Sequence, residues 1–535
     1  MRTHRVATTA WVVAGAAAMV LTGMSLAHEM ANYPGGAQAL GASVAAAAEA
    51  MRPLRWPAER LDTLGGYLTF HNVTMVTYFV TLYAAMLGAR VVRGWESEHS
   101  LEMVLATGWS RRAVVRDRAL GATVVLAVIA VGLGAGVAVA MAAGGAPDAA
   151  GSMATMAASG LAGFLAMGLG VLVSQLVGSP RAAAGVSALV LTVLYVATNV
   201  WEEIGPIGLV RFVSPYYYAN ESRALVPGHG FSVVAAVTLV VLGVALLAVS
   251  AWLFERRDYG GVAWKRRVRA QAAPRPPVAW RPLPLARTVT TALLARGWVG
   301  LAAWTASAVA LVALLVTLQQ AVMDVWTTFS FTAALAGGTA GTAEEQYLAF
   351  TVEVLAPIVA AYVVTQSATW LADLSAGRVE AVLASPVSWT RLVLERMAAV
   401  TAGVAVITAV ALGALVVGER LVGTDASVGG VARVGLACVL LGAAVAGVAS
   451  VLVVWLRTQV AVVALAVYLG ASYLLTVFVP MVGWSDGLLR LSVLWAFGHP
   501  YLDWPPLVGW GVLLVLAVGG GAVASFVAER TPKVA

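Results

Sequence analysis

The chain alternates between long apolar runs and shorter polar segments along its whole length. A helix that spans a bilayer needs about 20 consecutive, mostly apolar residues. Twelve runs meet this requirement, at residues 7–27, 66–89, 119–143, 154–177, 183–202, 231–254, 298–318, 347–368, 397–418, 432–456, 459–482 and 505–528. The pattern predicts an all-α polytopic membrane protein with about twelve transmembrane helices.

The composition agrees with this prediction. Hydrophobic residues make up 60% of the 535 positions and charged residues only 11%, whereas soluble domains carry about 25% charged residues. A water-soluble enzyme and a disordered chain are therefore excluded. The single cysteine, Cys438, excludes a disulfide framework and a thiolate metal cage.

The distribution of charge predicts the orientation. If the N-terminus lies in the cytoplasm, the segments on that side hold 25 of the 33 lysines and arginines. The positive-inside rule then places both termini in the cytoplasm. Ala, Gly, Val and Arg are abundant and Lys occurs only twice, which is typical of GC-rich bacterial coding. We expect a multi-pass protein of the bacterial plasma membrane.

An internal duplication divides the chain. Residues 101–118 (LEMVLATGWSRRAVVRDR) and 379–396 (VEAVLASPVSWTRLVLER) are identical at seven aligned positions. Two further matches, YLxF at 67 and 347 and FxxPY at 212 and 497, keep nearly the same spacing. The repeat predicts two six-helix bundles with pseudo-twofold symmetry about the membrane normal. We expect a first half at 1–254, a linker at 255–297 and a second half at 298–535.

The linker is basic and rich in proline, with the run Lys265-Arg266-Arg267-x-Arg269. Few aromatic residues accompany these charges, so nucleic-acid binding is not expected. A basic segment beside the membrane is typical of contact with anionic lipid heads.

Two repeated cytoplasmic loops, 90–118 and 369–396, are far longer than a helix connection requires. Apolar residues stand at helical spacing in both, and Thr107-Gly108 or Ser385-Pro386 interrupts each segment. The pattern predicts an amphipathic helix, a break and a helix that leads into the next span. One such helix would suit the bilayer surface, but two copies favour a partner with two equivalent docking surfaces.

These residues resemble the fused, twelve-helix permease of an ABC-2-type exporter, specifically the bacterial group that exports polyketide antibiotics or tetronasin-like ionophores. The resemblance rests on x-E-x-V-L-A-[ST]-x-x-S after spans 2 and 8, F-E-R-R-D-x-G-G after span 6, and S-P-Y or H-P-Y before spans 6 and 12. It covers essentially the whole chain.

The resemblance implies a coupling helix in each half, which docks on a separate ATP-binding subunit. Two copies of that subunit, with ATP and Mg²⁺, are then expected. The implied coupling residues are Glu96, Glu98, Glu102, Leu105, Ser110, Glu380, Leu383 and Ser388. Relatives often carry a glutamate pair before this helix, which the first half has in Glu96 and Glu98, while the second half offers only Asp373. Segments 203–230 and 483–504 correspond to short hydrophobic helices that re-enter the outer leaflet.

The sequence offers no catalytic or metal site. A P-loop requires a Gly-Lys dipeptide, and the two lysines follow Trp264 and Pro532. We therefore expect a transport subunit without a cofactor of its own, whose partner hydrolyses ATP.

One carboxylate, Glu353, stands well inside a predicted span, and such a residue is by default a functional candidate. Pro357 would leave the carbonyl of Glu353 without its helical donor, so a kink is expected. The matching part of span 2 holds His71 and Asn72, and we expect these polar groups to face a cargo cavity between the halves, with His71 as the nearest partner for Glu353 within the spans. The alternative is that Glu353 bonds to a neighbouring helix or reaches water.

The sequence thus predicts the permease subunit of an ATP-driven exporter for hydrophobic or amphipathic compounds, active in multidrug efflux and antibiotic resistance. A proton-coupled secondary transporter of the major facilitator type is the alternative, because it also has two six-helix halves. Its short loop with G-x-x-x-D-R-x-G-R-R between spans 2 and 3 is missing. A non-transporting membrane assembly or sensor protein has no support beyond apolar composition.

Overall fold

The structure is a computed structural model that describes residues 2–48, 55–97, 100–199, 205–263, 288–326, 341–482, 485–504 and 506–530. Every regular element among these residues is a helix. The chain forms two compact units, Thr8–Arg275 and Pro276–Ala535, with Met1–Ala7 grouped with the latter. We call them the N-unit and the C-unit and describe each by itself.

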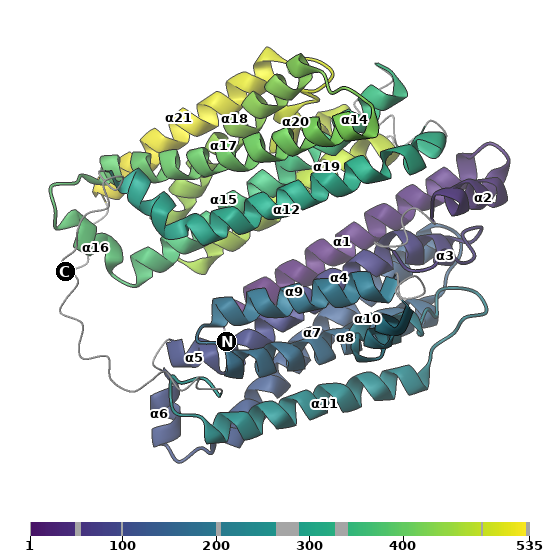
Figure 1. The fold of residues 1–535 in the computed structure, drawn as a ribbon, viewed down its shortest axis with the longest axis horizontal. Coiled ribbons are helices and arrows are strands. Elements are labelled where there is room, and N and C mark those ends of the chain that lie inside the picture. Colours follow the sequence, from purple (N-terminus) through teal and green to yellow (C-terminus); the bar gives the residue numbers. More distant parts are fainter. Residues whose placement is uncertain are drawn as a thin grey trace. The chain divides into compact units, whose positions relative to one another are not determined.

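The N-unit contains six helices that are long and apolar enough to cross a membrane (Figure 1). Its spans are α1 (Arg2–Asn32), the run of α3 (Leu64–Leu68), η2 (Thr69–Val73) and α4 (Thr74–Val91), α7 (Arg111–Ala143), α8 (Ala149–Leu176), α9 (Pro180–Asn199) and α11 (Val233–Arg256). Shorter helices are α2 (Gly36–Ala48), α5 (Arg93–Ser97), α6 (Ser100–Ala106), η3 (Gly205–Val213) and α10 (Pro215–Asn220).

The C-unit contains six further candidate spans. These are α12 (Val289–Trp326), the pair α14 (Ala343–Glu353) and α15 (Leu355–Ser375), α17 (Trp389–Val422), α18 (Val428–Leu456), α19 (Gln459–Val482) and α21 (Leu507–Arg530). Its short helices are α16 (Arg378–Leu383), η4 (Asp486–Leu491) and α20 (Val493–Phe497). The prediction of an all-helical protein with twelve apolar spans is confirmed.

Several helices extend beyond the apolar runs that predict them. Helix α1 continues to Asn32 and therefore carries Glu29, and α17 continues to Val422 and carries Glu419. Both glutamates are buried. These two carboxylates lie outside the predicted apolar runs, near the ends of their helices, and partners make their burial tolerable. The Tyr67 hydroxyl donates to Glu29, and the Thr424 hydroxyl donates to Glu419.

Small residues allow the helices to pack closely within each unit. A Cβ atom at Gly88 of α4 would lie 2.2 Å from the Met167 carbonyl oxygen of α8. In the C-unit, a Cβ atom at Gly520 of α21 would lie 2.6 Å from the Gly447 carbonyl carbon of α18. Such contacts are typical of membrane helices, which associate through close backbone approach rather than through the hydrophobic effect.

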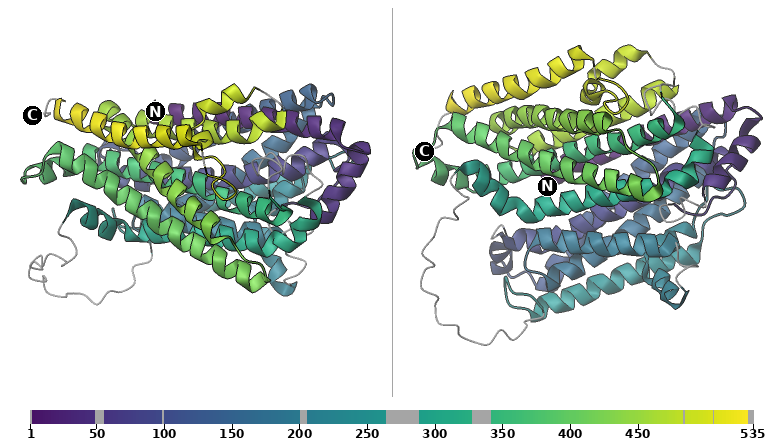
Figure 2. Two further views of the ribbon diagram at one scale, coloured as in Figure 1. Left: turned by 90° about the horizontal axis from the view of Figure 1, so that it is seen from above. Right: turned by 45° about the horizontal axis from the view of Figure 1, so that its top comes forward.

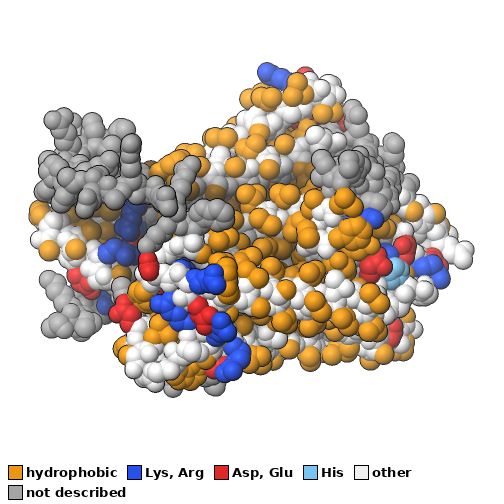
Figure 3. All heavy atoms as spheres, turned by 60° about the horizontal axis from the view of Figure 1, so that its bottom comes forward, with side chains coloured by type: hydrophobic (Ala, Val, Ile, Leu, Met, Phe, Trp, Pro, Cys, Tyr) orange, Lys and Arg blue, Asp and Glu red, His pale blue; other side chains and the backbone are white. Residues whose placement is uncertain are grey.

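The flanks of the helices are apolar on the outside as well. On the face drawn in Figure 3, hydrophobic side chains cover the middle of the helices and charged side chains gather near their ends. Val234, Val237 and Val241 of α11 are all more than half exposed. Lipid rather than water suits such a surface.

The two units have the same local structure between their fifth and sixth spans, which are α9 and α11 in the N-unit and α19 and α21 in the C-unit. Figure 2 shows the helices of each unit from two further directions. In the N-unit, Ser214 caps α10 and its hydroxyl lies 2.7 Å from the Thr198 hydroxyl. In the C-unit, Ser492 caps α20 and its hydroxyl lies 2.9 Å from the Thr476 hydroxyl. Thr198 and Thr476 are 278 residues apart, as are Ser214 and Ser492, and the repeated loops have the same spacing. The duplication is therefore present in side-chain contacts as well as in sequence.

Candidate functional site

The first repeated loop forms two short helices before α7. Helix α5 follows α4 directly, and α6 ends before a turn in which Gly108 has φ of +89°. That left-handed conformation is open to glycine at little cost and ends the helix. The Ser110 hydroxyl then accepts a hydrogen bond from the Ala113 amide and caps α7.

The second repeated loop has the same construction. Gly377, with φ of +67°, separates α15 from α16. A turn follows, and the Ser388 hydroxyl accepts from the Arg391 amide to cap α17. The predicted order of helix, break and capped helix is present in both loops. Ser110 and Ser388 act as helix caps in this structure, an assignment that their spacing alone did not indicate.

Each short helix buries one apolar residue and exposes a glutamate. In α6, Leu101 is fully buried while Glu102 and Met103 are exposed. In α16, Val379 is buried while Glu380 and Val382 are exposed. Leu105 and Leu383 are half-buried in matching positions. A helix with this pattern can contact a second protein through its exposed side while its buried residue keeps it packed against its own unit.

Glu102 is held by the segment that follows α11. The Tyr259 hydroxyl bonds to Glu102, and partial desolvation together with this carboxylate raises the pKa of Tyr259. Helix α6 is therefore linked to the segment that follows the last span of the N-unit.

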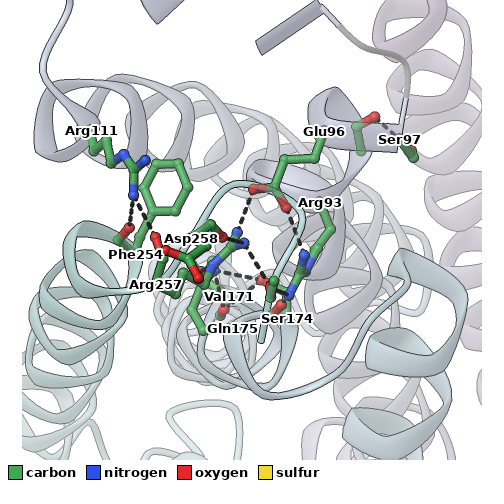
Figure 4. Close-up of polar contacts among 12 residues, drawn as sticks. Arg93, Glu96, Ser97, Arg111, Val171, Ser174, Gln175, Phe254, Arg257 and Asp258 are labelled. Atoms are coloured by element: carbon green, nitrogen blue, oxygen red, sulfur yellow. Dashed lines mark hydrogen bonds and ion pairs between the residues drawn. The ribbon is translucent and has the colours of Figure 1, made fainter. Parts of the chain in front are cut away.

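Glu96 lies beneath this helix in a buried ionic cluster (Figure 4). Its carboxylate pairs with Arg93 at 2.9 Å and with Arg257 at 2.7 Å, and all three side chains are at most 5% exposed. Arg93 also donates to the Ser174 carbonyl, and Arg257 donates to the Gln175 side chain. The cluster joins α5, α8 and the end of α11. Glu96 is therefore not part of the exposed surface, and Glu98 lies outside the described residues.

Asp373 has the same place in the C-unit. Its carboxylate accepts hydrogen bonds from Arg378 of α16 at 2.7 Å and from Arg396 of α17. Asp373 is only 4% exposed. Each short helix is thus preceded by a buried acid that pairs with arginines, two at Glu96 and three at Asp373, where Arg296 lies 3.9 Å away. Sequence reasoning missed these arginines, although Arg257 belongs to the F-E-R-R-D stretch and Arg396 aligns with Arg118.

The second span of the N-unit is irregular at His71 and Asn72. Residues Thr69–Val73 form a π-turn, which releases carbonyl groups from the α-helical ladder. Arg55 donates to the carbonyls of Phe70 and His71 at 3.0 and 2.8 Å. Burial lowers the pKa of Arg55. Nε2 of His71 and Nδ2 of Asn72 have no hydrogen-bond partner among the residues that the structure describes.

The matching span of the C-unit is interrupted at Val354, between Glu353 and Pro357. The break lies where Pro357 cannot donate to the Glu353 carbonyl, as predicted. Glu353 pairs with Nδ1 of His499 at 2.7 Å, so its partner is His499 of the H-P-Y turn and not His71. Burial alone would lower the pKa of His499. The hydrogen bond with Glu353 and the charge of that carboxylate outweigh this effect, so the pKa of His499 is raised. A common cavity for Glu353 and His71 stays a prediction, because they belong to different units.

The helices, their apolar flanks and the duplicated loops define a multi-pass membrane protein of two related halves. Residues 7–259 match the family described as ABC-2 family transporter protein. Residues 277–527 match the family described as multidrug efflux system permease Rv1217c, C-terminal domain. The chain therefore consists of an ABC-2 family permease domain followed by an Rv1217c-type permease C-terminal domain, and it is a transporter permease subunit. No curated protein matches the chain closely enough to count as a relative.

Membership of these families implies partnership with an ATP-binding subunit. It also indicates a transport subunit rather than an enzyme.

Proposed function

We propose that this permease exports hydrophobic or amphipathic compounds, among them polyketide antibiotics and drugs, across the bacterial plasma membrane with ATP hydrolysed by its partner. Both termini are then cytoplasmic. The observation that carries the proposal is the duplicated loop, in which α6 and α16 each expose a glutamate and bury one apolar residue.

Two copies of the ATP-binding subunit dock on these helices, one on α6 and one on α16. Glu102 and Glu380 are the exposed charges at the contact, and Leu105 and Leu383 are the half-buried apolar residues beside them. Ser110 and Ser388 fix the start of the next span through their caps. Movement of either short helix is in this way passed to α7 or α17.

The buried clusters give each short helix a rigid support. Glu96 and Asp373 do not touch the partner in this proposal, because their side chains are buried and already paired. Ion pairs in a low-dielectric site are costly to separate. The helices therefore transmit force instead of yielding to it.

Charge reversal on the exposed faces tests the coupling role. Glu102→Arg and Glu380→Arg should each lower substrate-stimulated ATPase activity at least fivefold, because a repulsive charge would face the docking surface. The fold should be retained, since exposed positions away from the core cost little stability. Arg391→Gln, an exposed residue at the start of α17, serves as the control. Wild-type assembly and stimulated ATPase activity in both reversals would show that these loops do not couple the subunits.

The interrupted spans supply the proposed cargo contacts. Glu353, Pro357, His71 and Asn72 lie at or beside irregular turns that free polar groups in an otherwise apolar span. Glu353→Gln should then reduce resistance to cationic compounds and leave resistance to neutral ones. Full transport of every compound by Glu353→Gln and Glu353→Ala would limit Glu353 to helix packing.

The Glu353–His499 pair favours one further candidate, a proton-coupled transporter, because both groups can carry protons. Transport by vesicles that contain the chain alone, driven by a proton gradient without nucleotide, would support it against the ATP-driven exporter.

A further inference from the structure

A groove of about 640 Å³ opens between α7, α8 and α11 of the N-unit. On α7 its lining runs from Ser110 to Thr123, and on α11 from Val244 to Trp252. Phe164 of α8 forms part of its floor. Within the N-unit, the lining of the groove includes no residue of the irregular second span or of α6.

The groove is apolar along its length and charged at one end. Leu120, Val244 and Leu247 line it, while Arg112 and Arg116 stand at its mouth. These arginines are 67% and 70% exposed. Twelve residues of α7, from Arg112 to Thr123, rise about 16 Å. The groove therefore reaches from the charged start of α7 into the apolar run that begins at residue 119.

The mouth carries an excess of positive charge. Arg112 and Arg116 line it and Arg256 stacks on the lining residue Trp252, while the acids beside them are Asp117 and Glu255. Arg112 pairs with Glu255 and Arg116 with Asp117, both at 2.7 Å. Such exposed ion pairs contribute little to stability. A phosphate can therefore replace the carboxylates as the partner of these arginines at a small cost in free energy. The Arg256 guanidinium lies 4.1 Å from the Trp252 ring centroid, and tryptophan is enriched where a membrane meets water.

From these features we infer that the groove binds one anionic phospholipid of the leaflet on the positively charged side. The phosphate lies between Arg112 and Arg116, and an acyl chain follows the apolar wall toward Thr123. Ser110, the cap that ends the first repeated loop, belongs to the lining. The lipid thus supports the start of α7 directly behind the coupling helix α6.

The site belongs to one half of the chain. The residues that align with Arg112 and Arg116 across the repeat are Thr390 and Leu394. Neither can bind a phosphate through charge. The inference is independent of ATP-driven export, since it requires only that the chain lies in a membrane.

Native mass spectrometry of the purified full chain with added lipid tests the site. Palmitoyl-oleoyl phosphatidylglycerol and phosphatidylcholine carry the same acyl chains, so their difference reports the headgroup. The wild type should retain phosphatidylglycerol preferentially, and Arg112→Gln/Arg116→Gln should weaken that binding about tenfold. Arg391→Gln, another exposed and paired arginine, should change it less than twofold.

A second pair of variants tests the apolar wall. Ala248 and Ala245 are both exposed on α11, but only Ala248 lines the groove. Ala248→Trp should lower binding of both lipids, and Ala245→Trp should leave it unchanged. Equal retention of the two lipids by the wild type, or an unchanged preference in the double arginine variant, would overturn the inference. Equal effects of the two tryptophan variants would overturn it as well.

Discussion

Individual charged residues inside this protein are balanced by specific partners. Glu96 is paired with Arg93 and Arg257, and Asp373 with Arg378 and Arg396. A buried charge that loses its partner carries the full cost of desolvation, whereas an exposed one is rehydrated. Mutations at buried acids should therefore lower the free energy of unfolding much more than mutations at exposed acids, even within one loop.

Glu96→Ala should lower the free energy of unfolding by about 3 kcal/mol, because it leaves Arg93 and Arg257 buried and unpaired. Thermal unfolding of the purified chain measures this effect. Glu102→Ala, six residues away and exposed, should change stability by less than about 0.5 kcal/mol. Equal losses in the two variants would contradict the buried cluster.

The Glu353–His499 pair predicts a dependence on pH. The pKa of His499 is raised above its ordinary value of 6.5 by Glu353. As long as Glu353 is ionised, the charged pair therefore stabilises the fold below about pH 6.5, the pKa of unfolded histidine, and this contribution is lost as pH rises through the higher folded pKa. The melting temperature of Glu353→Gln should be less sensitive to pH over this range than that of the wild type. A wild-type slope retained in Glu353→Gln would exclude the pair as its source.

At the scale of elements, the repeat predicts more than the apolar pattern does. The aligned loops correctly predicted two helix–break–helix segments, because glycine or proline breaks and serine caps act locally. The apolar runs predicted all twelve spans but not where the helices end. Helices α1 and α17 continue past their apolar runs and include Glu29 and Glu419, whose carboxyl groups have hydrogen-bond partners. His499 could not be paired with Glu353 from sequence, because they are 146 residues apart and meet only through packing.

Two matched hydroxyl pairs test the structural repeat. Thr198→Val and Thr476→Val each remove one hydroxyl contact, to Ser214 or to Ser492. Both should lower the free energy of unfolding by about 1 kcal/mol, which is the net value of a typical hydrogen bond. Thr238→Val, an exposed threonine of α11, is the control. A loss in only one of the two matched variants would contradict equivalent roles in the two units.

At the scale of the molecule, two related halves in one chain supply the two docking elements that we propose. Helices α6 and α16 stand at the same place in each unit, directly before a capped span. Their supports differ in detail, since the N-unit cluster includes the end of α11 and the C-unit cluster lies between α15, α16 and α17. The two short helices are therefore equivalent in position and distinct in their anchoring residues.

The central claim is that one copy of this permease binds two copies of an ATP-binding subunit through α6 and α16. Native mass spectrometry of the complex purified after co-expression measures the ratio directly. The account predicts one permease to two ATP-binding subunits, with loss of one copy from Glu102→Arg and of the other from Glu380→Arg. A permease that is isolated alone and transports with a proton gradient, without nucleotide, would contradict it.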